Sequence, residues 1–191
     1  MFLLSKPTEE LVDKFRSVQH ALPFSYSEVG ATKDGAVSGY TIDHNRIKLG
    51  QGEETYQRAN SALRSWKQFD LGWVSIVPSD TPIEVGRTVA LQAKTFGFWS
   101  LSACRVVYVI DELDPVRKFG FAYGTLPDHV ECGEERFTIE WHNSTDDSVW
   151  YDIYAFSHPQ HPLVKLGRSV ARRLQKRFVR ESMATMLQVT N

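Results

Sequence analysis

The chain has 191 residues, of which 42% are apolar, 12% aromatic and 24% charged. These values are typical of one globular domain spanning residues 1–191, and they exclude a disordered tail, a collagen-like repeat and a disulfide-stapled miniprotein. The 22 basic and 23 acidic residues give a net charge of -1, so no overall field favours nucleic acid or an anionic membrane.

The N-terminal apolar run is short, because Ser5, Lys6 and Pro7 end it after Leu4. A signal peptide needs an apolar core of ~7–15 residues. No run approaches the ~18 apolar residues of a membrane span. We therefore expect a cytoplasmic protein in which both cysteines, Cys104 and Cys132, remain buried thiols.

The first third of the chain predicts two helices and one strand. A helix is predicted over residues 8–20, where Pro7 and Thr8 suit its entry. A loop rich in Ser and Gly follows, so residues 1–39 form a helix-and-loop extension. A strand is then predicted over residues 40–49 and a helix over residues 53–67.

Six extended segments separated by short turns follow, and they predict an antiparallel meander. They cover residues 69–78, 83–96, 98–110, 119–126, 129–141 and 149–157. A long helix over residues 162–187 ends the chain and carries one apolar stripe, formed by Leu163, Leu166, Val170, Leu174 and Phe178. One helix cannot bury such a stripe alone, so a curved antiparallel sheet of about seven strands must wrap around it. The predicted fold is therefore α+β, of the helix-grip or START-like type, with an extra N-terminal helix.

Several sequence blocks between residue 40 and the C-terminus form a joint pattern. They are Gly50-Gln51-Gly52-Glu53, Leu63–Phe69 with Gly72-Trp73-Val74, Cys104–Tyr108, Phe119–His129, Gly133–Phe137, Val149–Tyr151, Ala155–Ser157 and Arg172–Phe178. In this order they resemble the DUF1990 family, also called UPF0548. The resemblance implies a START-like fold. Proteins of similar architecture bind lipids, hormones or polyketides, and some of them are cyclases or hydrolases. A fold does not by itself supply a function.

A polar face on the predicted strand 129–141 is the main candidate site. Side chains two residues apart share a face, so His129, Glu131 and Glu135 point the same way as Phe137, which indicates the inner face. A buried carboxylate without a partner is costly, so a cation is expected close by.

Arg105 is the predicted partner of these carboxylates, because it lies on an otherwise apolar strand. Counting from the predicted turns places Arg105 beside Phe121, and Phe121 beside Gly133. Arg105 would then reach Glu135 or Glu131 across the middle strand. A register slip of one residue would move the side chain to the other face.

The pair supports two interpretations. In the functional one, Arg105 and Glu135 lie at the floor of a cavity, and His129 and Tyr123 donate or accept protons at its rim. In the structural one, which such pairs adopt more often, a buried salt bridge closes the sheet and His129 lies in a solvated turn.

Aromatic residues of the predicted sheet are candidates for the cavity wall. The predicted ligand-binding set comprises Glu131, Phe119, Phe121, Trp73, Trp99, Trp150 and Tyr154. Plain core packing is the commoner role of aromatic residues on strands. Gly120, Ala122 and Gly124 leave the opposite face of one strand bare, which suits close approach of the last helix or a ligand.

The last helix also carries a basic series, which is predicted to lie mostly away from the apolar stripe. It comprises Lys165, Arg168, Arg172, Arg173, Lys176, Arg177 and Arg180. Such a helix can face RNA or an acidic partner, although the net charge of -1 favours a solvated outer face. No metal, phosphate-loop or serine-nucleophile motif is present, so neither a metal nor another cofactor is predicted.

The sequence thus predicts a protein that binds a small apolar or amphipathic molecule. Proton transfer by Glu135, His129, Arg105 and Tyr123 would support cyclisation, isomerisation or hydrolysis of that molecule in specialised metabolism. A carrier without chemistry is one alternative. A noncatalytic module that uses the basic helix for RNA or an acidic partner is the other.

Overall fold

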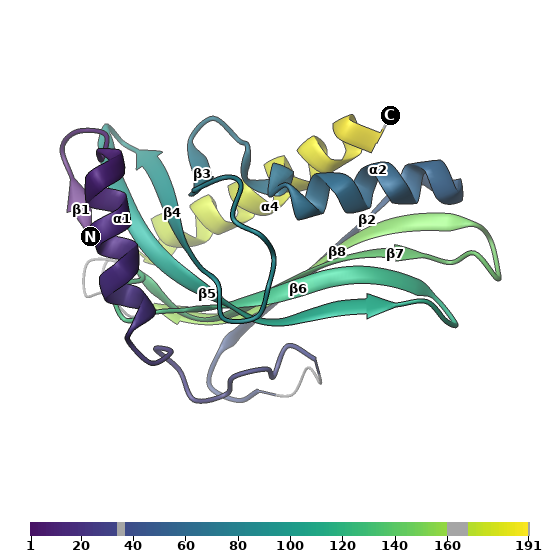
Figure 1. Cartoon of the computed structure of the whole chain (residues 1–191), viewed down its shortest axis with the longest axis horizontal. Helices are drawn as coiled ribbons and strands as arrows, with labels where there is room; N and C mark the ends of the chain where they lie inside the picture. Colours follow the sequence, from purple (N-terminus) through teal and green to yellow (C-terminus); the bar gives the residue numbers. More distant parts are fainter. Residues whose placement is uncertain (34–36, 160–167, 191) are drawn as a thin grey trace.

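The structure of the protein, a computed structural model, describes residues 1–33, 37–159 and 168–190. The elements, in chain order, are β1 (Phe2–Leu3), α1 (Glu9–His20), β2 (Thr41–Gln51), α2 (Gly52–Arg64), the 3-10 helix η1 (Lys67–Phe69), β3 (Val74–Val77), β4 (Thr88–Thr95), β5 (Phe98–Glu112), β6 (Arg117–Thr125), β7 (Glu131–Trp141), β8 (Ser148–Pro159) and α4 (Arg168–Thr190) (Figure 1). None of the helices in these ranges has the length and hydropathy needed to cross a membrane.

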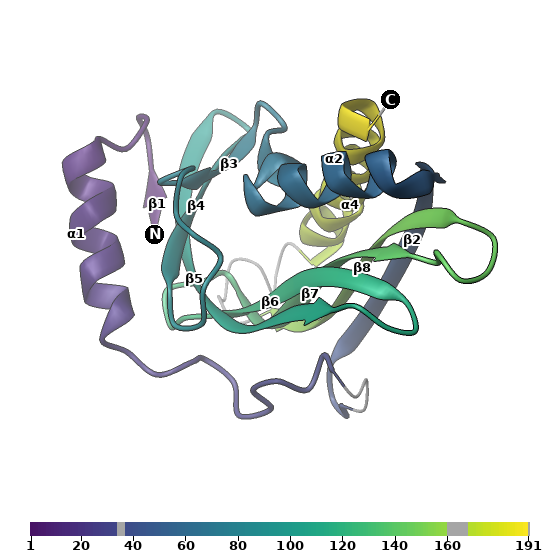
Figure 2. The ribbon, with the colours of Figure 1, turned by 45° about the vertical axis from the view of Figure 1, so that its right-hand side comes forward.

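One curved antiparallel sheet forms the body of the protein. Its strand order is β2-β8-β7-β6-β5-β4-β3, and β1 pairs with β5 outside this path. Helices α2 and α4 lie together over the concave face, whereas α1 lies beside β4 and β5 at the far end (Figures 1 and 2). The predicted helix-grip fold with an extra N-terminal helix is confirmed. The first residues of the predicted last helix, 162–167, lie outside the described ranges.

Aromatic side chains from the sheet and from η1 form the centre of the core on the concave face. The ring of Phe137 lies 5.5 Å from Phe69 and 5.4 Å from Phe121, and Trp66 meets Phe121 edge-on at 4.8 Å. Edge-on and tilted aromatic pairs stabilise a core beyond the area that they bury. These contacts attach η1 and α2 to the middle of the sheet.

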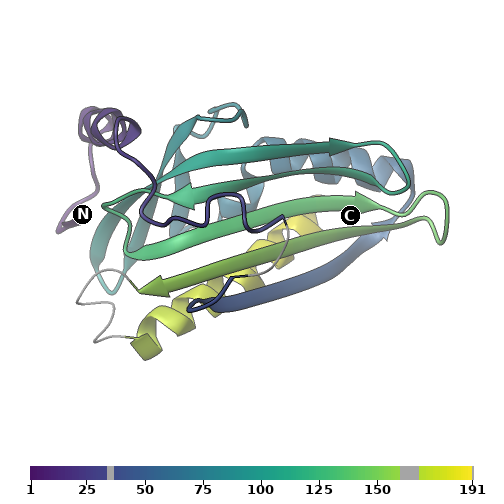
Figure 3. The ribbon, with the colours of Figure 1, turned by 90° about the horizontal axis from the view of Figure 1, so that it is seen from below.

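The N-terminal extension packs against the opposite, convex face. Helix α1 begins with Thr8 as its N-cap, and it buries Val12 and Phe15 against Leu101 and Leu126. Residues 21–33 then run across the outside of the sheet, as seen from below in Figure 3. The extension therefore covers part of the sheet face that α2 and α4 leave open.

Two of the predicted extended segments are shorter in the structure. The segment 69–78 is a strand only over Val74–Val77, because Phe69 still belongs to η1 and Gly72 has a φ of 73°. The segment 83–96 becomes a strand only at Thr88, after Gly86 with a φ of 86°. A residue in a left-handed conformation cannot continue a strand.

The bare face of β6 is the convex one, so neither the last helix nor the cavity occupies it. A Cβ atom on Gly124 would lie 2.0 Å from the Tyr26 hydroxyl oxygen, and one on Gly120 would lie 2.4 Å from Thr138 Cγ2. Gly124 thus makes room for a residue of the N-terminal extension, and Gly120 for a neighbouring strand.

Candidate functional site

A cavity of about 650 Å³ lies between the concave face of the sheet and α4. This size is within the usual range for small-molecule sites, roughly 300–1,000 Å³. Its apolar wall includes Phe69, Trp73, Leu91, Phe178, Val179 and Met183. Besides Trp73, four of the predicted site residues line it, namely Tyr123, His129, Glu131 and Glu135. The cavity therefore combines an apolar wall with a few polar groups.

Tyr123 and Glu135 form a hydrogen-bonded pair inside this cavity. They are directly opposite each other on β6 and β7, and the Tyr123 hydroxyl donates to Glu135 Oε2 at 2.9 Å. Burial raises the pKa of Glu135 to about 7, although the Tyr123 hydrogen bond acts in the opposite direction. The nearby charge of Asp43 also raises this pKa. The carboxyl group is thus close to half protonated at neutral pH.

Tyr123 remains a neutral donor in this pair. Burial raises the pKa of Tyr123 well above its ordinary value, and the charge of Glu135 raises it further. A phenol in this state can orient the carboxyl group without giving up its proton. Tyr123 therefore acts on Glu135 by position, and the exchangeable proton of the pair belongs to the carboxyl group.

His129 and Glu131 lie at the end of the cavity formed by the β6–β7 turn. The Nδ1 atom of His129 lies 2.9 Å from the Glu131 carbonyl oxygen and 3.0 Å from its amide nitrogen. Burial lowers the pKa of His129 to about 4, so the ring is neutral at pH 7. Burial also raises the pKa of Glu131. One ring nitrogen of His129 is thus engaged with its own turn.

The predicted Arg105–Glu135 pair is wrong. Arg105 lies opposite Gly124, and Gly124 lies opposite Glu134, because both turns fall later than predicted. The side chain is therefore on the convex face, where its Nη2 donates to the carbonyl oxygens of His20 and Leu22 at 2.7 Å. Arg105 thus holds the C-terminal end of α1 and does not reach the cavity.

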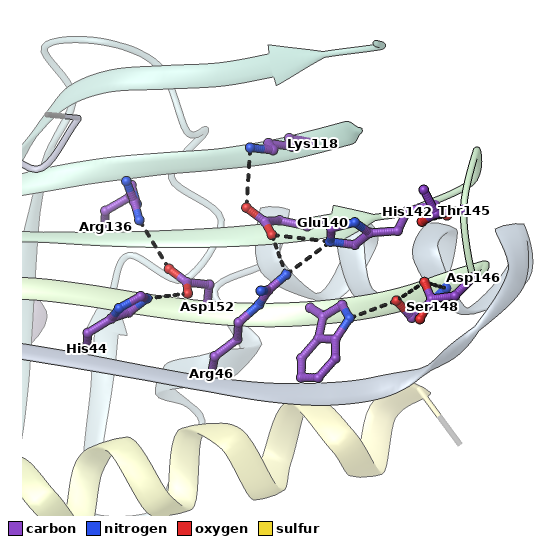
Figure 4. Close-up of polar contacts among 11 residues, drawn as sticks. His44, Arg46, Lys118, Arg136, Glu140, His142, Thr145, Asp146, Ser148 and Asp152 are labelled. Carbon is purple, nitrogen blue, oxygen red and sulfur yellow. Dashed lines mark hydrogen bonds and ion pairs between the residues drawn. The ribbon is translucent and has the colours of Figure 1, made fainter. Parts of the chain in front are cut away.

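Trp150 and Tyr154, predicted ligand-binding residues, also lie on the convex face and not in the cavity. The guanidinium of Arg46 stacks on the Trp150 ring at 4.6 Å, and that of Arg136 on the Tyr154 ring at 5.3 Å. Figure 4 shows the surrounding polar network, in which Arg46 reaches Glu140 at 2.6 Å. Trp150 and Tyr154 are each two residues from Asp152 on β8, so all three side chains point to the same face. Asp152 pairs with Arg136 and His44 on the convex face, which is why the two aromatic residues do not reach the cavity.

Three further aromatic residues that were predicted to bind the ligand do not line the cavity. Phe119 and Phe121 point to the concave side, but they are fully buried in the core and do not line the cavity. Trp99 is not part of the cavity wall, and Lys94 lies over its ring at 5.6 Å. Only Trp73 of the predicted aromatic set lines the cavity, where its Nε1 donates to Glu181 Oε2 at 2.6 Å.

Three basic residues of α4 line the cavity, although the sequence placed this series mostly on the outer face. They are Arg172, Lys176 and Arg180. Their spacing of four residues puts them on one side of the helix, next to the lining residues Leu174 and Phe178. This spacing was visible in the sequence. The apolar stripe alone, however, does not indicate which of the basic residues beside it face the cavity. Lys165, in the same series, lies outside the described residues.

Glu134 is a buried carboxyl group that the sequence analysis did not single out. It points to the convex face, where it accepts from the Tyr26 hydroxyl and the Gly30 amide, both at 2.7 Å, and from the Thr32 amide at 3.0 Å. The Thr32 hydroxyl donates to it as well. Four donors saturate the carboxyl group, so the Glu134 side chain anchors the N-terminal extension, although the residue also borders the cavity.

Comparisons with known proteins agree with this fold. A family model described as "Domain of unknown function (DUF1990)" matches residues 25–185. A UPF0548 protein of Dictyostelium discoideum is 40% identical and covers 98% of this chain and 94% of its own. A UPF0548 protein of Arabidopsis thaliana is 38% identical over 80% of this chain and 75% of its own. Among solved structures, a hypothetical protein from Helicobacter pylori superposes with a TM-score of 0.54 at 11% identity, over 88% of this chain and 96% of that one. This last likeness shows a shared fold alone.

Proposed function

The chain belongs to the DUF1990 family, and we propose that its cavity binds a largely apolar small molecule to or from which Glu135 transfers a proton. The observation that carries this proposal is the placement of one carboxyl group, with a pKa raised to about 7, in a cavity with a mostly apolar wall. A proton-transfer group works best when its pKa is near the operating pH.

The pair geometry supports a division of roles between Tyr123 and Glu135. Glu135 Oε2 accepts from Tyr123 at 2.9 Å, while no described residue forms a hydrogen bond with Oε1 of the same carboxyl group. A ligand in the cavity can therefore exchange a proton with Oε1 while Tyr123 holds the group in position. The reaction types that we propose are cyclisation, isomerisation or hydrolysis of the ligand.

Blocking the cavity should remove ligand binding. Ala155 on β8 lies directly opposite Glu135 on β7 and lines the cavity. We therefore expect Ala155→Phe to fill the space that the ligand needs. We expect binding of the neutral dye Nile red to weaken about tenfold or more. Native mass spectrometry of wild-type protein from its own source should show a bound small molecule that Ala155→Phe lacks.

The matched control is Ala184→Phe, on an exposed position of α4 that does not line the cavity. This variant should bind the dye as the wild type does. Ala93→Phe blocks another part of the wall and serves if Ala155→Phe unfolds at a lower temperature. If the wild type binds neither Nile red nor any molecule from its source, the proposed function is incorrect.

A further inference from the structure

One wall of the cavity carries three cations at the spacing of successive helix turns. Arg172, Lys176 and Arg180 line the cavity from α4, which crosses the open side of the sheet in Figure 2. Positions 172 to 180 span about 12 Å along a helix at 1.5 Å per residue. A ligand on this wall therefore meets a row of positive groups parallel to the helix axis.

Of these cations, Arg172 has the closest carboxylate partner among the described residues, whereas Arg180 has a longer pair with Glu181 and Lys176 interacts with Asp43 only through its charge. Arg172 forms a two-pronged pair with Asp43, in which Nη2 lies 2.8 Å from Oδ1. This pairing lowers the pKa of Asp43 from its ordinary value. A planar guanidinium on a carboxylate in this geometry is a strong, preorganised contact. Arg172 and Asp43 are therefore one structural unit of the wall.

Arg180 and Lys176 retain donors for a ligand. The Nη2 atom of Arg180 lies 3.5 Å from Glu181 Oε1, but Arg177 already donates to that oxygen at 2.8 Å. Trp73 occupies the other oxygen of Glu181. Lys176 forms no hydrogen bond or ion pair within the described ranges, and its side chain is exposed. Two positive groups of the wall are thus available at the edge of an apolar cavity.

The carboxyl groups of the cavity leave this excess in place. Asp43 is taken by Arg172. Burial raises the pKa of both Glu131 and Glu135 above the ordinary value, which favours their neutral forms. The cavity thus has polarity along its length, with cations at the exposed edge of α4 and a weakly charged, apolar interior.

We propose that the ligand is an amphipathic organic anion. Its acidic group binds Lys176 and Arg180, and its apolar part lies against Trp73 and Phe178 and extends toward Glu135. Because the cations are at the exposed edge, the ligand's charge remains partly hydrated and avoids the large cost of burying an ion. The apolar part gains from leaving water. This inference rests on the proposed binding function and adds the chemical class of the ligand.

The test compares two probes that differ only in their head group, dodecanoate and dodecanol. Their dissociation constants are measured at pH 6.5, below the pKa of Glu135 and above that of a free carboxylic acid, by isothermal titration calorimetry with the wild type, Lys176→Gln and Arg180→Gln. We expect the wild type to prefer dodecanoate about tenfold, as a charge-assisted contact at an exposed edge can provide. Each substitution should reduce this preference about threefold or more and leave dodecanol binding unchanged.

Arg173→Gln is the matched control, because Arg173 is an exposed cation of the same helix that does not line the cavity. It should keep the full preference, and so should the charge-conserving variant Lys176→Arg. Equal binding of the two probes by the wild type would overturn this inference and leave the proposed function intact. So would an equal loss of both probes in Lys176→Gln. If neither probe binds although Nile red does, this inference is overturned and the proposed function stands.

Discussion

Replacing Glu134 by alanine is expected to lower the free energy of unfolding by about 3–5 kcal/mol, because its partners lose a shared acceptor in a buried site. The side chain accepts from Tyr26, Gly30 and Thr32 of the N-terminal extension. Denaturant unfolding measures the loss. Hydrogen exchange should show residues 25–33 opening first, since Glu134 holds them to β7.

Glu140→Ala is the control for this prediction. Glu140 is on the same strand and the same convex face, but its partners Arg46 and Lys118 are themselves partly exposed (Figure 4). Exposed pairs contribute little, so we expect a loss of about 1 kcal/mol or less. Equal losses in the two variants would show that Glu134 does not anchor the extension.

Replacing Glu135 by glutamine is expected to stabilise the protein at alkaline pH and to have little effect at pH 4.5. The pKa of Glu135 rises from 4.5 to about 7 on folding. The folded state thus binds this proton more tightly than the unfolded state does. The stability that this provides is fully present below pH 4.5 and is lost as the pH rises through about 7. Glutamine carries no charge and escapes this loss.

The size of the effect follows from the shift in pKa. One unit corresponds to about 1.4 kcal/mol, and access of water to the cavity reduces the total, so we expect about 1–3 kcal/mol at pH 8.5. Denaturant unfolding of both proteins at pH 4.5, 7 and 8.5 measures the difference. A difference that stays constant with pH would show that Glu135 titrates normally.

Tyr123→Phe should lower the free energy of unfolding mainly above pH 7, because the Tyr123 hydroxyl stabilises the charged carboxylate of Glu135. The same denaturant unfolding series measures this loss.

Local patterns in the sequence predicted the three helices α1, α2 and α4, the seven strands β2–β8 and their order, but not β1 or η1. Thr8 begins α1 as predicted, and the turn residues separate the strands of the meander. Phe137 correctly marked the concave face, because alternation within one strand depends only on that strand. The family could also be identified from the sequence, because its sequence blocks occur in a characteristic order along the chain.

The placement of Glu135 in the cavity could be predicted for the same reason, but the identity of its partner could not. Glu135 shares a strand with Phe137, so one strand was enough to orient it. The partner depends on the registers of two hairpins, and a shift in either one moves the contact along the sheet. The counted register paired Arg105 with Phe121, whereas the structure pairs it with Gly124 and gives Glu135 to Tyr123.

The sequence by itself determined an α+β helix-grip fold, the DUF1990 family and one inward carboxyl group, because these follow from local periodicity and from ordered motifs. Only the tertiary structure decided which side chains meet. It placed Arg105 and Trp150 on the convex face, directed Lys176 and Arg180 to the cavity, and used the bare face of β6 for the N-terminal extension. The physical reason is that strand register and helix rotation depend on contacts between segments that are distant in the chain, and a local pattern does not contain them.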